Sequence, residues 1–379
     1  MFIRAMYMLV FCSLVFTGCG DDDPATPSGD QAAECPDGPM LTVSPIAIAD
    51  IESVFPLGNI NPPGHICPTD HMGLTIRTEP GAAAPIEVDL VSPGDLTVVQ
   101  LSAQEFVNAG YADFGIGLQA CDDIHIGFGH VTTLDEDLFG FAGDFADWTF
   151  QSETVTAEET YRYYHLVCEV DVVAGQRLGT GGGVEDQWGV DFSVYDLSLP
   201  PAVMASARWD GEWSLYARCC LDYFVDGPVH DALYALQDLP ASILAAGDAC
   251  GNLHDDVPGA LRGCWFLAGT ILTYPDENNI SFSCRNTNPD QALIGVGSAV
   301  PTVPGAAYFV DTVDTGHENR VFDQVTPAGG LQVYMPTYPS SLIILVQLVS
   351  ADTLWVEGIP AGLPEEAQVF SEAKTIFVR

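Results

Sequence analysis

From Leu41 to about Val203, short runs of alternating apolar and polar residues are separated by turns rich in Gly, Pro and Asp. Strands are predicted where apolar side chains recur at every second position, because alternate residues of a strand face the same side of a sheet. The pattern predicts a first domain over residues 41–203, built mainly from strands. The predicted strands are Ile86–Val91, Leu96–Leu101, Phe114–Leu118, Ile124–Val131, Tyr163–Val173 and Gly189–Val194.

The two prolines after Leu199 interrupt this pattern and predict a domain boundary near Pro200. One helical segment is predicted over Val229–Gln237 and onward to Ala246, divided by Pro240 because proline has no amide hydrogen to donate. Beyond Gly263 the pattern is again that of strands. We therefore expect a second, mostly β domain over residues 204–379 with one short helical segment. Its predicted strands are Trp265–Tyr274, Ala292–Val296, Gln332–Met335, Leu342–Val349, Thr353–Val356 and Thr375–Val378.

Residues 1–18 have the organisation of a lipoprotein signal peptide, with Arg4 before an apolar run over Ala5–Phe16 and a lipobox-like end at Cys19. Cys19 would then carry the lipid and be the only attachment to the membrane. Residues 19–40 predict a flexible tether. Gly20 after the cysteine favours an outer-membrane lipoprotein of the cell envelope, on its periplasmic or surface side. The alternative is an ordinary secretory peptide cleaved nearby.

The charge balance is strongly acidic, with 52 Asp plus Glu against 11 Lys plus Arg. A net charge of −41 disfavours nucleic acid and anionic lipid surfaces as partners, because both repel an acidic protein. An acidic surface is typical of proteins from some habitats, and it also suits the binding of cations. Composition leaves these two explanations open.

Nine of the 11 cysteines remain after Cys12 leaves with the signal peptide and Cys19 is lipidated. In an exported protein most cysteines form disulfides, and an odd number leaves at least one free or paired outside the chain. The absence of a Cys-x-x-Cys pair argues against a zinc site made of thiolates. The disulfides that we expect are Cys121–Cys168 and Cys250–Cys264.

The segment Val173–Asp196 (VAGQRLGTGGGVEDQWGVDFSVYD) predicts the end of a strand, a Gly-rich turn and an alternating strand. It resembles the end of the catalytic domain of lysostaphin/LytM-type zinc endopeptidases, which cleave cell-wall peptide bridges. The block Gly58–Ile76 supports the resemblance, since His71-x-Gly73-x-Thr75 is similar to the family's His-x-Gly-x-Asp. The third block is either Phe128–Val131 or Tyr163–Leu166, similar to the family's Tyr-x-His-Leu.

This resemblance implies a LytM-like β-sandwich of the duplicated hybrid motif type and a zinc ion held by two histidines and a carboxylate. His71 matches the first ligand, while Thr75 stands where the family has Asp and Asp191 where it has His. Gly189 replaces one catalytic histidine. The other catalytic histidine is matched by His130 or His165. The resemblance therefore implies a catalytically degenerate domain that binds cell-wall peptide, glycan or an envelope protein.

Two alternatives stay open. A rearranged site of His71, Asp191 and His130, assisted by Asp70 or His65, would still offer nitrogen and oxygen ligands to zinc and support an active metallohydrolase of the peptidoglycan endopeptidase type. Otherwise these residues form hydrogen bonds in a vestigial cleft without a cofactor, and the chain is a purely structural surface lipoprotein.

Overall fold

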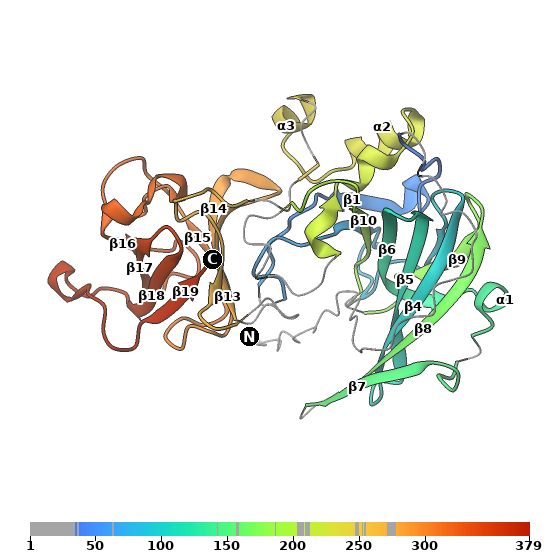
Figure 1. Cartoon of the computed structure of the whole chain (residues 1–379), viewed down its shortest axis with the longest axis horizontal. Helices are drawn as coiled ribbons and strands as arrows, with labels where there is room; N and C mark the ends of the chain where they lie inside the picture. Colours follow the sequence, from blue (N-terminus) through green and yellow to red (C-terminus); the bar gives the residue numbers. More distant parts are fainter. Residues whose placement is uncertain are drawn as a thin grey trace.

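The computed structural model describes residues 35, 38–62, 64–141, 143–156, 159–185, 187–202, 208, 213–246, 250–251, 253, 255–270 and 278–379. The protein is mainly β, as the pattern of the sequence predicts, and two large antiparallel sheets form two lobes (Figure 1). The predicted signal peptide and Cys19 lie outside the described residues.

The first lobe contains an 11-stranded sheet with the order β1-β2-β10-β6-β5-β4-β8-β7. Off this path, β11 pairs with β10, and β9 pairs with both β3 and β6. The strands are β1 (Ile51–Phe55), β2 (Met72–Ile76), β3 (Val88–Val91), β4 (Leu96–Phe106), β5 (Tyr111–Cys121), β6 (Ile124–Leu134), β7 (Thr149–Val155), β8 (Thr160–Val172), β9 (Arg177–Gly181), β10 (Gly189–Asp196) and β11 (Ala217–Arg218).

Alternation along β10 decides which of its side chains enter the core. Val190, Phe192 and Val194 are fully buried. Phe192 lies directly opposite Phe128 of β6, and the two rings stack with their centroids 5.2 Å apart. Such cross-strand aromatic pairs stabilise a sheet and fix its register. As a consequence Asp191, which lies between two core residues, faces away from the core.

The packing places the division between the lobes later than the predicted boundary near Pro200. The segment from β11 onward carries the two helices α2 (Pro228–Ala235) and α3 (Ala241–Ala246), separated at Pro240 as predicted. Leu221, Leu233 and Leu253 belong to the hydrophobic core of the first lobe. The core of the second lobe begins only at Leu261, so the described residues between 213 and 253 pack as part of the first lobe.

The second lobe is an eight-stranded sheet with the order β15-β14-β13-β12-β19-β18-β17-β16. Its core includes Trp265, Phe282, Tyr308 and Phe377, which are all buried. The strands are β12 (Gly263–Leu267), β13 (Asn279–Arg285), β14 (Asn288–Val296), β15 (Ala306–Val310), β16 (Leu331–Tyr334), β17 (Leu342–Ser350), β18 (Thr353–Pro360) and β19 (Thr375–Val378). One further short helix, α1 (Glu136–Phe139), follows β6 in the first lobe.

The disulfides differ from both predicted pairs. Cys168 is a half-buried free thiol, because its strand β8 is separated from Cys121 on β5 by the intervening β4. Two strand spacings amount to about 9–10 Å, whereas a disulfide requires Cα atoms within about 7 Å. The predicted Cys250–Cys264 pair is also wrong, since Cys250 packs against the first core and Cys264 lies in β12. The observed disulfides are Cys35–Cys121, Cys67–Cys264 and Cys219–Cys250, and Cys220 and Cys284 are free.

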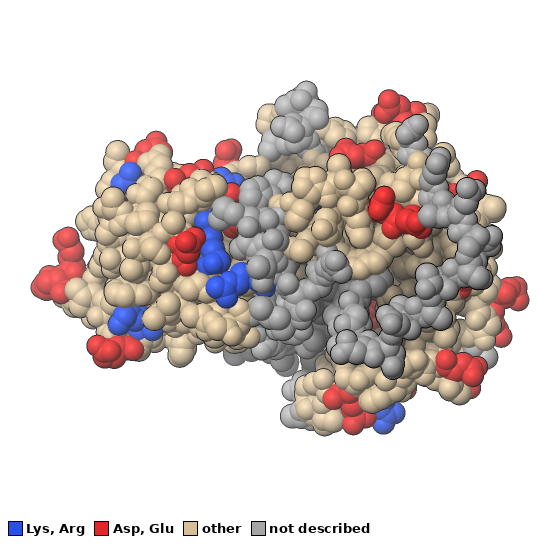
Figure 2. Space-filling model, viewed as in Figure 1, with Lys and Arg blue, Asp and Glu red and all other residues tan. Residues whose placement is uncertain are grey.

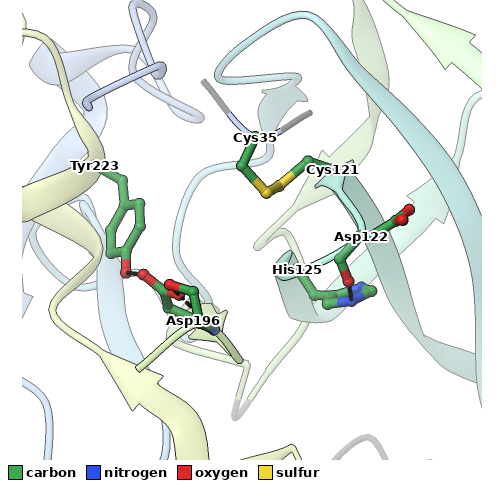
Figure 3. Close-up of a disulfide and its surroundings, with 7 residues drawn as sticks. Cys35, Cys121, Asp122, His125, Asp196 and Tyr223 are labelled. Carbon is green, nitrogen blue, oxygen red and sulfur yellow. Dashed lines mark hydrogen bonds between the residues drawn. A yellow bond between two sulfur atoms is a disulfide. The ribbon is translucent and has the colours of Figure 1, made fainter. Parts of the chain in front are cut away.

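One disulfide begins within the predicted tether. Cys35 lies within residues 19–40 and is bonded to Cys121 at the end of β5 (Figure 3). His125 accompanies the disulfide there, with a ring nitrogen 3.1 Å from the carbonyl oxygen of Asp122. Three disulfides indicate a protein of an oxidising compartment outside the cytoplasm. No helix in the described ranges is long and apolar enough to cross a membrane.

Two contacts fix the second lobe against the first. The Cys67–Cys264 disulfide joins the loop between β1 and β2 to β12. In addition, the Asn286 side chain donates a hydrogen bond of 2.9 Å to the carbonyl oxygen of Pro56. On the face shown in Figure 2, acidic side chains lie over both lobes, and most of the visible basic ones lie over the second.

Candidate functional site

A cleft of about 470 Å³ lies between the two lobes. The first lobe lines it with the ends of β1, β2, β4, β5, β6 and β10 and with the loops before β2 and β10. The second lobe contributes Arg285, Leu293, Ala307 and Phe309 from β13, β14 and β15. The cleft is open, and several histidine and carboxylate side chains face it.

Asp191 is at the centre of this polar group. It lies on β10 opposite Gly73 of β2 on one side and Gly129 of β6 on the other. A Cβ atom at Gly129 would lie 3.2 Å from the Oδ2 of Asp191, so the glycine leaves the carboxylate the space that it occupies. His130 of β6 and His71, which directly precedes β2, both approach it.

Both histidines point the same ring nitrogen at the same carboxylate oxygen. The Nε2 of His71 lies 3.6 Å from Asp191 Oδ2, and the Nε2 of His130 lies 3.5 Å from it. The side chains of the two histidines are 15% and 18% exposed, so the group is half-buried and still open to the cleft.

A β-bulge aims His130 into the cleft. From Phe114 to Ile116, β5 advances by two residues while β6 advances by three, from Phe128 to Val131, so β6 contains one extra residue. His130 adopts a left-handed backbone conformation there, with a φ of 58°. A residue other than glycine in this conformation is strained by about 1–3 kcal/mol, and bulges next to functional sites often redirect a side chain. The strain at His130 is therefore a local sign of function.

A second carboxylate holds each ring from behind. The Nδ1 of His130 donates to Asp113 Oδ2 at 2.6 Å, and the Nδ1 of His71 donates to Asp70 Oδ1 at 3.1 Å. The hydroxyl of Tyr195 donates to the other oxygen of Asp70 at 3.2 Å. Because a carboxylate only accepts hydrogen bonds, these contacts fix the proton on Nδ1 and leave Nε2 facing the cleft.

The carboxylates also determine the charge of the two rings. Burial lowers the pKa of His130, but the nearby charges of Asp113 and Asp191 outweigh it and raise the pKa to about 10. The pKa of His71 is raised as well, because Asp191 and Asp70 outweigh the effect of burial. At neutral pH the His130 ring is therefore protonated, with its charge balanced by Asp113 and Asp191, and the same kind of carboxylate pair favours the charged form of His71.

His65 is the third histidine of the cleft. Its ring is buried and makes an edge-to-face contact with His71, with the centroids 5.2 Å apart. Burial lowers its pKa well below the ordinary value, and the charges of His71 and His130 lower it further. The loop that carries it is closed by two backbone hydrogen bonds between Asn61 and His65, of 2.9 and 3.1 Å. His65 is thus a buried ring beside His71 whose lowered pKa favours the neutral imidazole.

Most of the sequence-predicted site residues come together in this cleft. His71, Asp191, His130, Asp70 and His65 belong to one connected group. His165 does not, because it lies on β8 between Ser102 and Thr149 and is absent from the lining of the cleft. Of the two candidate histidines, His130 therefore lines the cleft and His165 does not.

Sequence reasoning missed Asp113 and Tyr195, the residues that support the two rings. A carboxylate on the strand next to the one that carries His130 is the only signal for Asp113, and it becomes informative only when the register is known. Tyr195 follows the alternating stretch of β10 and its ring is part of the first lobe's core, so the sequence pattern gives no sign that its hydroxyl contacts Asp70.

Gly189 has no room for a side chain. A Cβ atom there would lie 2.6 Å from the carbonyl oxygen of Leu74 on the paired strand β2. The LytM-like pattern has a catalytic histidine at this position, and such a residue would force β10 and β2 apart. Thr75, which stands at the pattern's second ligand, is the direct cross-strand partner of Gly189.

By type, the two imidazole nitrogens and the carboxylate oxygen are donors that zinc accepts. Two ligand atoms bound tetrahedrally to zinc at 2.0–2.1 Å lie about 3.3 Å apart. The separations of 3.5 and 3.6 Å between Nε2 and Oδ2 are close to this value and too long for good hydrogen bonds. Within the described residues no group of three or more His, Cys, Asp or Glu side chains is placed to hold a metal ion, so binding requires the side chains of the cleft to rearrange.

Three comparisons with known proteins found no match to this chain, whether with family models, curated proteins or solved structures. The LytM-like pattern therefore stays a resemblance in three sequence blocks. A functional conclusion has to come from the side chains of the cleft.

Proposed function

We propose that the cleft binds one divalent metal ion, zinc by the type of its donors, through His71, His130 and Asp191, and that the protein is a metal-dependent hydrolase of the cell envelope. One observation carries the proposal: both Nε2 atoms face one carboxylate oxygen while each Nδ1 is held by a second carboxylate. Histidines that ligate metals usually have such a partner on their other nitrogen.

When bound, the metal would lower the pKa of a water molecule and polarise the carbonyl group to be cleaved. The chain's own residues do the rest. Asp70 and Asp113 orient the two imidazoles, and the buried ring of His65 packs edge to face against that of His71. Trp188 lines the cleft with its side chain 47% exposed and offers an apolar surface to a peptide or a sugar ring.

The substrate class follows from the three sequence blocks and from export. We propose a cell-wall peptide, with the protein held at the outer membrane by a lipid on Cys19. The cleft between two lobes suits a polymer, because it gives an extended chain walls on both sides of the metal group.

A second candidate function is binding without catalysis. The observation that favours it is Gly189, where the fold has no space for the second catalytic histidine of the LytM-like pattern. In this case the same cleft would bind cell-wall peptide, glycan or an envelope protein, and the histidines and carboxylates would supply hydrogen bonds only.

Digestion of purified peptidoglycan sacculi separates the two functions. The exported chain with its disulfides formed, loaded with zinc, should release new amino groups from sacculi. His130→Ala should abolish the release, whereas His165→Ala, the matched histidine on a strand outside the cleft, should retain it. Sacculi that are bound but not cleaved by the zinc-loaded protein would refute hydrolysis and favour the binding function.

A further inference from the structure

The second lobe brings one basic side chain to the cleft. Arg285 is the last residue of β13, just before the turn to β14. It lines the wall of the cleft that the second lobe forms, across from the wall that carries the histidines. The next residue, Asn286, donates its 2.9 Å hydrogen bond to the carbonyl oxygen of Pro56, which directly follows β1. This contact between the lobes holds the turn, and therefore Arg285, at the rim of the cleft.

Arg285 has no partner within the part of the chain that the structure describes. It is exposed, and no ion pair or side-chain hydrogen bond involves it there. By contrast, Arg162, Arg177 and Arg262 each contact a carboxylate, at 2.8, 2.7 and 2.7 Å. Arg77 and Arg218 likewise contact no described carboxylate, so what distinguishes Arg285 is that it also lines the cleft.

The chemistry of the guanidinium group defines what it binds. Its planar fork matches the two oxygens of a carboxylate, and such bidentate contacts are strong and directional. No other lysine or arginine lines the cleft, while Asp113, Glu185 and Asp191 do. An anionic ligand group that lies away from the histidine group would therefore be repelled by these carboxylates and attracted at Arg285.

We infer that Arg285 binds a carboxylate of the peptide chain that lies in the cleft, and so fixes which bond of that chain reaches the histidine group. This inference rests on the proposed function, because it specifies the substrate of the same cleft. It adds that the peptide must carry a free carboxylate on the side that faces the second lobe. Arg285 is a specificity-determining residue here and takes no part in holding the metal.

Retention on insoluble sacculi tests the inference at equilibrium. Three preparations serve as probes: native sacculi, sacculi whose peptide carboxylates have been converted to amides, and glycan strands stripped of their peptides. His130→Ala serves as the background for all measurements, so that cleavage does not disturb binding. On native sacculi, adding Arg285→Gln should weaken retention roughly 10- to 100-fold, the loss expected for a hydrogen-bonded charge pair. Retention of the Arg285→Lys variant should lie between that of the protein with Arg285 and that of the Arg285→Gln variant.

The matched control is Arg77→Gln, which makes the same change in net charge at an exposed arginine outside the cleft. Arg77→Gln should leave retention on native sacculi unchanged. Amidated sacculi should retain the His130→Ala protein equally with and without Arg285→Gln. An equal loss in both arginine variants, or undiminished binding to amidated sacculi, would overturn the inference. So would retention on the stripped glycan, or no retention on native sacculi.

Zinc content distinguishes the inference about Arg285 from the proposed hydrolase function. It is measured on the single variant Arg285→Gln, in which His130 is retained. It should equal that of the unmodified protein, since Arg285 contacts none of the three proposed ligands in the described structure. Absent zinc in both would contradict the proposed hydrolase. If zinc is absent but retention still depends on Arg285 and on the peptide carboxylates, the inference about Arg285 holds without the hydrolase function.

Discussion

Removal of the Cys67–Cys264 disulfide should weaken metal binding as well as the fold. Cys67 lies in the loop between His65 and His71, and its partner is in β12 of the second lobe. The disulfide thus fixes the loop that supplies one proposed ligand to the lobe that forms the other wall of the cleft. The perturbation is the double variant Cys67→Ala/Cys264→Ala.

The size of both effects follows from the structure. The two cysteines are 197 residues apart, and the Cys219–Cys250 bond, which spans 31 residues, shortens the loop that they close. Chain entropy for a loop of this length gives an upper figure of about 5 kcal/mol for the loss in the free energy of unfolding. Ordering one freed loop residue again on metal binding costs about 1–2 kcal/mol, which is a roughly 5- to 30-fold loss of zinc affinity.

The control is Cys35→Ala/Cys121→Ala, which opens a disulfide spanning 86 residues at the end of β5 remote from the cleft. Chain entropy predicts a similar loss of stability, about 4–5 kcal/mol, with no change in zinc affinity. Zinc affinity is measured by competition with a chromophoric chelator, and stability by denaturant unfolding. Equal zinc affinities in the two double variants would refute the reasoning that the disulfide positions the metal loop.

Three further predictions concern single groups. Asp113→Asn should lower zinc affinity 10- to 100-fold in chelator competition, because the amide holds the Nδ1 of His130 without a charge. Gly189→Ala should lower the free energy of unfolding by about 1–3 kcal/mol in denaturant, because its Cβ would lie 2.6 Å from the carbonyl oxygen of Leu74. Burial lowers the pKa of His125 to about 4 from the value of 6.5 expected in the unfolded chain, so its contribution to stability is full above pH 6.5 and is lost as the pH falls towards 4. The loss reaches about 3 kcal/mol, and in denaturant unfolding at several pH values His125→Asn should remove that part of the decline.

Local patterns in the sequence predict many of the strands and the orientation of Asp191, but they do not predict β1, β2, β13 or β15. The alternation of Val190, Phe192 and Val194 predicts β10 and also predicts that Asp191 faces the opposite side. His71 and Asp191 were assigned to one site from short blocks, and the structure brings them together. Elements with a clear period are predictable because the period is a property of neighbouring residues.

Features that depend on distant pairing were not predictable. Nothing in the local pattern distinguishes His130 from His165, since only the bulge and the left-handed backbone at His130 direct one of them into the cleft. The predicted Cys121–Cys168 pair failed because β4 lies between the two strands, an order that only the folded sheet reveals. Asp113 was missed for the same reason, as its contact with His130 depends on the register of β5 and β6.

The most direct test of the central claim is the metal content of the exported, oxidised protein after passage over a weak chelator. The account predicts about one zinc ion per chain, lost in Asp191→Ala and kept in Asp226→Ala, an exposed aspartate outside the cleft. A chain without metal, or one whose zinc persists in Asp191→Ala, would contradict the claim that His71, His130 and Asp191 form a metal site.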